Sequence, residues 1–348
     1  MLSIRSVAAA SLVAAAGMFA IARAQGPAGP GSGAPAGVAG PTAGARPEDT
    51  PGPVILGFAA QGNDWYWLRR RGADVELMRG GARTAPTTRA RGQGWQGLAL
   101  AGGQVFVFER AGKQANLLRI PSGGGSPTPV VAGRQNPDGL RGLGDQVFWV
   151  EWIPEARPDL TFIPLLGPRL RLCVCPAAGN AVRVLGEWPA EATVEKLDPL
   201  DPEILGIAGD AVYFRMRRRL ATEFYRVPLS GGEPVRVASE AQDVNGILAD
   251  GRFCWIAPSE EATPASGLRC VRKSGPDGTA VTVCEWLTGK GRLFARGKEI
   301  FYSADWLYAI PERLDLPRPL RKMERGQIAA DGDVVIHFDD AGQPTPVK

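Results

Sequence analysis

The sequence predicts an all-β fold, a single β-propeller built from four-stranded antiparallel blades. A pattern recurs about every 42 residues, and its clearest copy comprises 204–214 followed by 224–234. Each unit contains four short segments rich in β-branched and aromatic residues, separated by glycine and aspartate turns. These units show no helical periodicity, so a ring of stacked sheets is favoured over a helical repeat.

Seven such units follow one another, and each is expected to begin with the innermost strand of a blade. The innermost strands are expected to begin near Leu56, Leu98, Leu140, Leu205, Ile247, Leu293 and Ile328. The seventh unit, 326–348, is short, so it is either a blade without outer strands or the completion of a six-bladed ring. We expect seven blades, with six as the alternative.

Residues 1–24 are typical of a signal peptide. Arg5 supplies the positive charge, 7–21 is an apolar run, and 22–24 (Ala-Arg-Ala) is a small-x-small cleavage site. The apolar run is shorter than the ~20 residues that span a bilayer. We therefore expect export to the periplasm or the cell exterior, with an uncleaved membrane tether as the alternative.

Composition limits the kinds of partner. Residues 25–53 are expected to form a Gly/Pro/Ala-rich disordered linker, and residues 54–348 the propeller domain. The chain is 44% hydrophobic and 22% charged, as in globular domains, and its net charge of +4 is spread along the sequence. Export and the lack of a nucleic-acid-binding motif exclude nucleic acid as a partner. We expect a monomer without cofactor or metal, no transmembrane helix beyond the N-terminal segment, and a protein or an anionic polymer or glycan as partner.

One face of the predicted ring is expected to carry the long connections. In a blade, the loops after the second and fourth strands open on one face, which we call the long-loop face, and the turns after the first and third strands open on the tight-turn face. Two inserts, 151–169 and 188–203, belong to the long-loop face. Long loops on a rigid scaffold commonly carry binding. The insert with Trp152 is expected to act as a lid or partner contact, or to fold back onto its own blade.

Two groups of residues are candidates for binding on the long-loop face. The runs 69–71 and 217–219 are each three arginines, and together they would form a basic rim that attracts anions; the alternative is solvated strand ends. Polar residues and one indole precede the innermost strands and are expected to ring the mouth of the central channel, as a small polar or sugar ligand would require. The candidate binding residues are Trp95, Asp138, Trp152, Glu203, Arg217, Arg218, Arg219, Asn245, Arg292 and Gln327, with Gln96 beside Trp95.

The sequence contains no clear catalytic group. The single histidine, His337, lies in an aromatic strand, so neither a catalytic triad nor a histidine-rich metal site is expected. Paired carboxylates act without histidine in glycoside hydrolysis. Four acidic residues of the long-loop face could supply such a pair, namely Asp138, Glu151, Glu155 and Glu203.

Five cysteines leave disulfide bonding open. Cys270 and Cys284 flank the turn at 275–278 almost symmetrically, so a cross-strand disulfide is one expectation, with Cys254 as a competing partner. Cys173 and Cys175 alternate along one strand and should point the same way. Buried, unreactive thiols are the alternative for most of the five.

The segment 225–234 (Tyr-Arg-Val-Pro-Leu-Ser-Gly-Gly-Glu-Pro), together with the similar 118–124, resembles the repeats of bacterial TolB-like propellers. The resemblance extends over about 55–340 at the level of blade repeats. It implies the propeller fold and an exported, often periplasmic, setting. The expected function is a non-enzymatic binding scaffold that engages a protein or polymer through the long-loop face. The alternative is an exported carbohydrate-active hydrolase or lyase with carboxylates at the channel mouth.

Overall fold

The structure is a computed structural model of the chain. It describes residues 53–153, 169–179, 181–189, 201–217, 221–240, 244–249, 251–259, 268–274, 279–287, 291–296, 298–313, 315–323, 327–331, 334–339 and 341–347. The predicted signal peptide and nearly all of the predicted linker lie outside these residues. All described residues belong to one compact unit, Pro51–Lys348.

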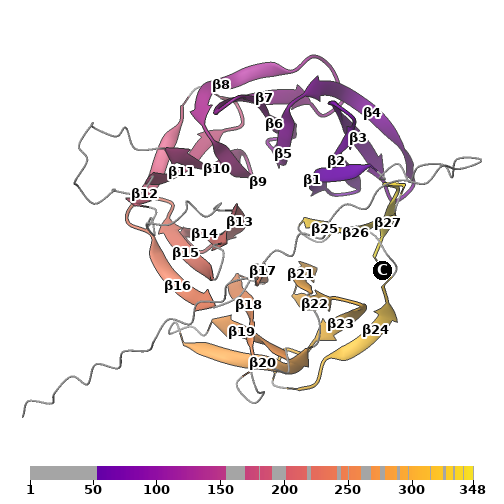
Figure 1. Cartoon of the computed structure of the whole chain (residues 1–348), viewed down its shortest axis with the longest axis vertical. Helices are drawn as coiled ribbons and strands as arrows, with labels where there is room; N and C mark the ends of the chain where they lie inside the picture. The colour runs from indigo at the N-terminus through magenta and orange to yellow at the C-terminus, as the bar shows by residue number, and fades with distance from the viewer. Residues whose placement is uncertain are drawn as a thin grey trace, which may run out of the picture. The chain divides into compact units, whose positions relative to one another are not determined.

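Seven antiparallel sheets surround a central axis, which confirms the predicted seven-bladed β-propeller (Figure 1). The innermost strands are β1 (Val54–Gln61), β5 (Trp95–Ala101), β9 (Pro137–Leu143), β13 (Asp201–Ala208), β17 (Gly246–Ala249), β21 (Arg292–Arg296) and β25 (Gln327–Asp331). The second strands are β2 (Asp64–Arg71), β6 (Gln104–Ala111), β10 (Gln146–Ile153), β14 (Ala211–Arg217), β18 (Arg252–Pro258), β22 (Glu299–Ser303) and β26 (Val334–Phe338).

The outer half of each blade completes the sheet. The third strands are β3 (Asp74–Gly81), β7 (Gln114–Pro121), β11 (Arg169–Pro176), β15 (Thr222–Pro228), β19 (Arg269–Ser274), β23 (Trp306–Ile310) and β27 (Pro344–Pro346). The outermost strands are β4 (Thr84–Gln93), β8 (Thr128–Gln135), β12 (Arg183–Pro189), β16 (Val235–Glu240), β20 (Ala280–Leu287) and β24 (Arg318–Lys322). Six sheets therefore have four strands in the described part of the chain, and the seventh, β25-β26-β27, has three.

Glycines let the innermost strands pack closely on one another. Gly97 of β5 has a φ of 62°, and a Cβ there would lie only 3.0 Å from the Cβ of Leu140 on β9. The register of β5 with β6 shifts at this point, between Gln96 and Ala99. Glycine is needed because it accepts positive φ and leaves room for the neighbouring strand.

Aromatic residues of the second strands fill the space between blades. Trp67 and Trp149 are fully buried, and the ring of Trp149 meets Phe108 of the preceding blade at 6.1 Å. The ring closes between the first and last blades in the same way, because Phe338 of β26 packs against Phe58 and Trp67. Burial of large aromatic residues contributes strongly to stability, so the core lies at the seams between blades.

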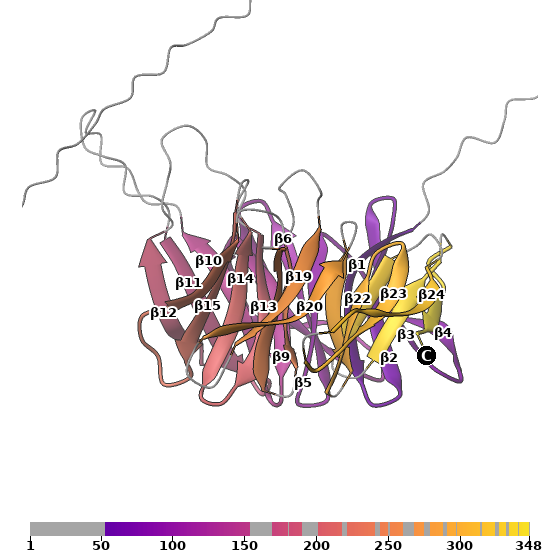
Figure 2. The ribbon, with the colours of Figure 1, turned by 90° about the horizontal axis from the view of Figure 1, so that it is seen from below.

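The difference in connection length between the two faces of the ring is not the same in every blade, as the sequence analysis had expected it to be. Figure 2 shows the long-loop face at the top. The connections 154–168, 190–200 and 260–267 belong to this face, but they lie outside the described residues. In blades 1 and 2 the same face has the short turns 72–73 and 112–113 after the second strands and single residues, 94 and 136, after the fourth strands. The expectation of long loops is therefore wrong for blades 1 and 2, where tight hairpins join the second and third strands.

The tight-turn face is also less uniform than expected. Its connections 122–127, 229–234 and 311–317, after third strands, are longer than hairpin turns. The length asymmetry between the two faces is consequently concentrated in blades 3 to 5. Within the described residues, no helix has the length and apolar character needed to cross a membrane.

Candidate binding surface

The structure brings the predicted channel residues to one end of the innermost strands. Trp95, Arg292 and Gln327 are the first residues of β5, β21 and β25. Asp138 is the second residue of β9, and Glu203 is the third residue of β13. Because β5, β9, β13, β17, β21 and β25 each follow the outermost strand of the preceding blade, their first residues share the long-loop face. Their role in binding stays a prediction, and the side-chain contacts decide what this end of the ring offers to a ligand.

Glu203 is an exposed carboxylate with a defined partner at this mouth. Its Oε2 forms an ion pair with Nη2 of Arg215 at 2.8 Å, and half of the Glu203 side chain remains exposed. The Arg215 side chain is buried and also donates from Nη1 to the carbonyl oxygen of Val244 at 3.1 Å. Arg215 thus joins blade 4 to blade 5, and Glu203 balances its charge.

Two amides at the mouth also join neighbouring blades. Asn245 donates from Nδ2 to the carbonyl oxygen of Leu293 at 2.9 Å and accepts from the Leu293 N–H at 2.8 Å. Gln96 donates from Nε2 to the carbonyl oxygen of Pro137 at 3.3 Å. Both amides satisfy backbone groups of the next blade, so their first role is structural.

Three further candidates have different surroundings. Asp138 is exposed and accepts from the N–H of Gly139 at 2.8 Å. Arg292 is exposed at the start of β21. The backbone of Gln327 pairs with Phe338, and its side chain lies outside the described residues.

Trp95 is not available to a ligand. Its exposed fraction is 2%, and it packs in the core between blades 1 and 2 with Leu68 and Leu98. The indole lies over Gly92 of β4, where a Cβ would come within 2.1 Å of the ring. The structure therefore removes Trp95 from the candidate binding residues, because the adjacent glycine creates space for the indole inside the sheet packing.

Glu151, a candidate catalytic carboxylate, is buried between blades 2 and 3. Its Oε2 accepts from Nη2 of Arg134 at 2.7 Å, and its Oε1 accepts from the indole N–H of Trp149 at 2.7 Å. The hydrogen bonds to Glu151 raise the pKa of the Arg134 guanidinium above its ordinary value. Glu151 therefore neutralises a neighbouring cation and orients a core tryptophan, while Glu155 lies outside the described residues.

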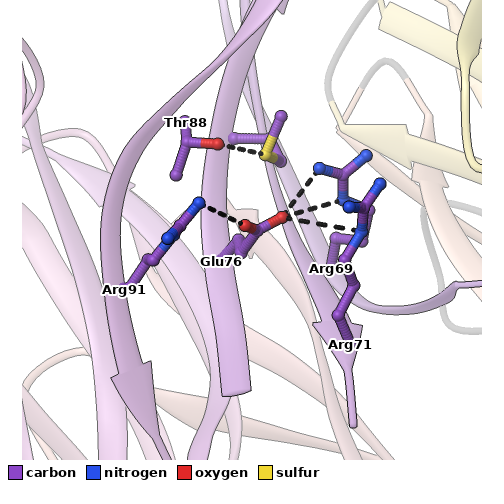
Figure 3. Close-up of polar contacts among 6 residues, drawn as sticks. Arg69, Arg71, Glu76, Thr88 and Arg91 are labelled. Atoms are coloured by element: carbon purple, nitrogen blue, oxygen red, sulfur yellow. Dashed lines mark hydrogen bonds and ion pairs between the residues drawn. The ribbon is translucent and has the colours of Figure 1, made fainter.

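The first arginine run forms a cluster around one carboxylate (Figure 3). The two-residue turn at 72–73 places Arg69 opposite Glu76, and Glu76 stands opposite Arg91 on β4. Oε2 of Glu76 lies 2.7 Å from Nη2 of Arg69 and 3.9 Å from Nε of Arg71, and Oε1 lies 3.0 Å from Nη2 of Arg91. Hydrogen bonds from Arg69 lower the pKa of Glu76 against the opposing effect of burial, and the charges of Arg91 and Arg71 add to this.

This cluster changes the picture of a basic rim. Arg69 is buried with Glu76 and holds the sheet together, whereas Arg70, Arg71 and Arg91 are exposed. Of the second run, Arg217 ends β14 and is half-buried, and Arg218 and Arg219 lie outside the described residues.

Trp152 and His337 are half-buried strand residues. Trp152 packs at the edge of the core between blades 3 and 4, and its carbonyl oxygen accepts from Nδ2 of Asn136 at 3.4 Å. His337 stands between Ile328 and Thr345 in the sheet of blade 7. In the part of the chain that the structure describes, no group of three or more His, Cys, Asp or Glu residues could hold a metal ion.

All five cysteines are free and buried. Val271, not Cys270, stands opposite Cys284, because the register shifts beside this pair. The expected disulfide between Cys270 and Cys284 is therefore not formed. Cys173 and Cys175 share one core cluster, as their alternation predicted.

Sequence reasoning missed a hollow on blade 6. It is lined by Ala304, Asp305, Trp306, Tyr308, Lys322 and Met323. The available signal was the exposed-strand pattern Trp306-Leu307-Tyr308 directly after a short polar turn. An aromatic strand is equally typical of the core, so only the exposed fraction of each side chain distinguishes a surface site from core packing.

Comparisons with known proteins define the class of the fold. No family model matches the chain, and no curated protein matches it. An acylaminoacyl peptidase of Pyrococcus horikoshii matches with a TM-score of 0.56 and 10% identity over 85% of this chain and 52% of that chain. The chain spans about half the length of the peptidase structures that it matches.

Two further solved structures are similar. An oligogalacturonate lyase of Vibrio parahaemolyticus matches with a TM-score of 0.54 and 14% identity over 83% of this chain and 86% of that chain. TolB of Acinetobacter baumannii matches with a TM-score of 0.42 and 12% identity over 74% of this chain and 65% of that chain. At these identities, the likeness to the peptidase and the lyase shows the fold alone. The chain is a seven-bladed β-propeller.

Proposed function

We propose that the chain is an exported, non-enzymatic β-propeller that binds a protein or polymer partner through its long-loop face. One observation carries the proposal: several acidic and amide side chains at or near the channel mouth are engaged in contacts that stabilise a blade or join neighbouring blades. Glu151 is buried with Arg134, Glu203 pairs with Arg215, and Asn245 satisfies Leu293. Groups held in this way are poorly placed to transfer protons to a substrate.

The rigid ring supports the binding role. The blades are joined by buried aromatic residues and by inter-blade hydrogen bonds, so connections on the long-loop face start from fixed strand ends. A preorganised scaffold lowers the entropy cost of binding. The long connections of blades 3 and 5 begin and end on this face, and residues 1–24 support export.

The test compares the two faces in the full chain. Replacement of 154–168 by a short Gly/Ser linker should abolish binding to a purified partner that the wild type captures. Replacement of 229–234, which lies on the tight-turn face, is the matched control and should leave binding unchanged. Equal binding by both variants, or loss only in the control, would contradict the proposal.

A carbohydrate-active hydrolase or lyase is the second candidate. Gly139 lies against the backbone of Pro202 and Glu203, so Asp138 and Glu203 project from adjacent innermost strands at the channel mouth. Two carboxylates close together are the arrangement that glycoside hydrolysis uses. Turnover of a polysaccharide panel that is lost in both Asp138→Asn and Glu203→Gln would favour this candidate over the binding scaffold.

A further inference from the structure

The hollow on blade 6 lies apart from the channel mouth and from the arginine cluster of blade 1. It has a volume of about 320 Å³ and opens beside the turn between β22 and β23, at the long-loop end of the blade. Its size is at the lower end of the range of small-molecule sites. None of the residues that line the hollow takes part in the function proposed above, so an inference about the hollow is independent of that function.

The backbone of the hollow is fixed by its own hydrogen bonds. The N–H of Ala304 donates to the carbonyl oxygen of Trp306 at 3.0 Å, and the N–H of Met323 donates to the carbonyl oxygen of Asp305 at 2.9 Å. Trp306 and Lys322 are direct cross-strand partners. The turn and the two strands therefore fix the backbone that carries the lining side chains.

The lining combines a flat apolar surface with polar groups at its border. Trp306 is 41% exposed, whereas Trp65, Trp67 and Trp149 are buried. Tyr308 follows two residues later on the same side of the strand, and its ring packs at 6.3 Å from Tyr302, which anchors it to the core. An exposed indole beside a half-buried phenol forms an apolar platform that the fold itself does not cover.

The polar groups of the hollow differ from those of the channel mouth. Among the described residues, the side chains of Asp305 and Lys322 and the hydroxyl of Tyr308 make no hydrogen bond or ion pair. Glu203 and Asn245, by contrast, are engaged in the contacts described above. The hollow thus offers an acceptor, a donor and a hydroxyl that a ligand would not have to detach from structural contacts.

We propose that this hollow is a binding site for a neutral saccharide. A pyranose ring has an apolar C–H face that covers an indole, and its hydroxyls both donate and accept hydrogen bonds. The carboxylate of Asp305 accepts from one hydroxyl and the ammonium of Lys322 donates to another. The two opposite charges cancel, so the site does not favour an anionic or a cationic ligand as a whole.

The experiment measures binding of cellohexaose to the full chain by saturation-transfer NMR and by tryptophan fluorescence. Trp306→Ala should weaken binding by about tenfold or more, which corresponds to the loss of one aromatic stacking contact. Asp305→Asn and Lys322→Ala should each weaken it by a smaller factor. Leu320→Ala is the matched control, because Leu320 is equally exposed on the neighbouring strand β24 but does not line the hollow.

Three results would overturn the proposal. The first is no binding of cellohexaose to the wild type, and the second is equal binding by wild type and Trp306→Ala. The third is preference for hexagalacturonate, since that would require a net positive site. Replacement of 154–168 should leave cellohexaose binding unchanged, so failure of this proposal and failure of the proposed partner-binding role are distinguishable.

Discussion

Arg141 on β9 and Asp331 at the end of β25 form an ion pair across the central channel. Nη2 of Arg141 lies 2.8 Å from Oδ1 of Asp331, and both side chains are mostly buried. Blades 3 and 7 are not neighbours in the ring, since blades 1 and 2 lie between them on the shorter path. The other oxygen of Asp331, Oδ2, accepts from the N–H of Ala60 on β1 at 2.9 Å. Asp331 thus joins three blades near the tight-turn face, where the innermost strands end.

Removal of this junction should destabilise the ring. Asp331→Ala should lower the free energy of unfolding by about 2 kcal/mol, because it removes a charged acceptor from two buried donors. Arg141→Met should cost less, about 1 kcal/mol, since the Asp331–Ala60 hydrogen bond remains. Urea unfolding of both single variants and of the double variant measures the coupling between the two residues.

The control for this cycle is the exposed pair Arg296–Glu299, whose charged atoms lie 3.1 Å apart. Removal of this pair should change the free energy of unfolding by less than about 0.5 kcal/mol. A coupling between Arg141 and Asp331 that is no larger than in the control would show that the channel pair contributes no more than a surface contact.

Glu76 should make the stability of blade 1 depend on pH. Its pKa in the folded chain is below the ordinary value of 4.5, mainly because Arg69 donates hydrogen bonds to it. The unfolded chain therefore takes up a proton at a higher pH than the folded chain. The stabilisation by Glu76 is fully present above about pH 4.5, the unfolded value, and is lost as the pH falls through the lower folded value.

Glu76→Gln should consequently be less stable than the wild type at pH 7, by about 3 kcal/mol, because the buried guanidinium of Arg69 loses its charged partner. The difference between the two proteins should shrink as the pH is lowered to 3. Urea midpoints at both pH values measure it, with the exposed Glu299→Gln as control. A difference that stays constant with pH would contradict the assignment of this effect to the Glu76 carboxylate.

The blade architecture was predictable because each strand carries its own local pattern. Aromatic second strands such as those with Trp67 and Trp149 indicate packing on both sides, and glycine turns fix where they end. The short seventh unit was ambiguous, since a third strand of three residues with two prolines, Pro344 and Pro346, has almost no strand pattern. This strand pairs with β26 through the chain reversal between Asp339 and Gln343, where the N–H of Asp339 donates to the carbonyl oxygen of Gln343 at 3.2 Å.

The candidate site was less predictable because side-chain contacts depend on register between strands. The turn at 72–73 sets Arg69 opposite Glu76, so this pair follows from the sequence once the hairpin is recognised. Arg91 joins the cluster from β4 across two irregularities in the register, which no local pattern reveals. Trp95 at a strand entrance could face the channel or the core, and Gly92 on the preceding strand decides for the core.

Two prolines should protect the outer edge of blade 7 from pairing with another chain. The N–H of Val347 donates to the carbonyl oxygen of Val335, and the carbonyl oxygen of Gln343 accepts from the N–H of Asp339. Alternate residues of this segment therefore bond to β26 or to the residue that follows it. Pro344 and Pro346 face the other way by the same alternation, and neither has an N–H to offer. Pro344→Val/Pro346→Val should therefore self-associate more than the wild type in concentration-dependent light scattering, because it creates two outward donors.

Thr345→Val is the matched control for the edge. It adds a β-branched apolar residue to the same strand, but its N–H faces β26 and no outward donor is created. It should scatter light like the wild type. Equal association of the control and the double variant would assign the effect to hydrophobicity instead of backbone pairing.

The five cysteines should be unreactive until the chain unfolds. Burial raises the pKa of Cys173 and Cys284 to about 12 and that of Cys175, Cys254 and Cys270 to about 11. The thiolate is the reactive form, and these groups are also shielded from solvent. An aromatic disulfide reagent at pH 8 should therefore label the native chain slowly, at a rate set by unfolding. In denaturant it should titrate five thiols, whereas three would reveal the disulfide that the hairpin pattern predicted between Cys270 and Cys284.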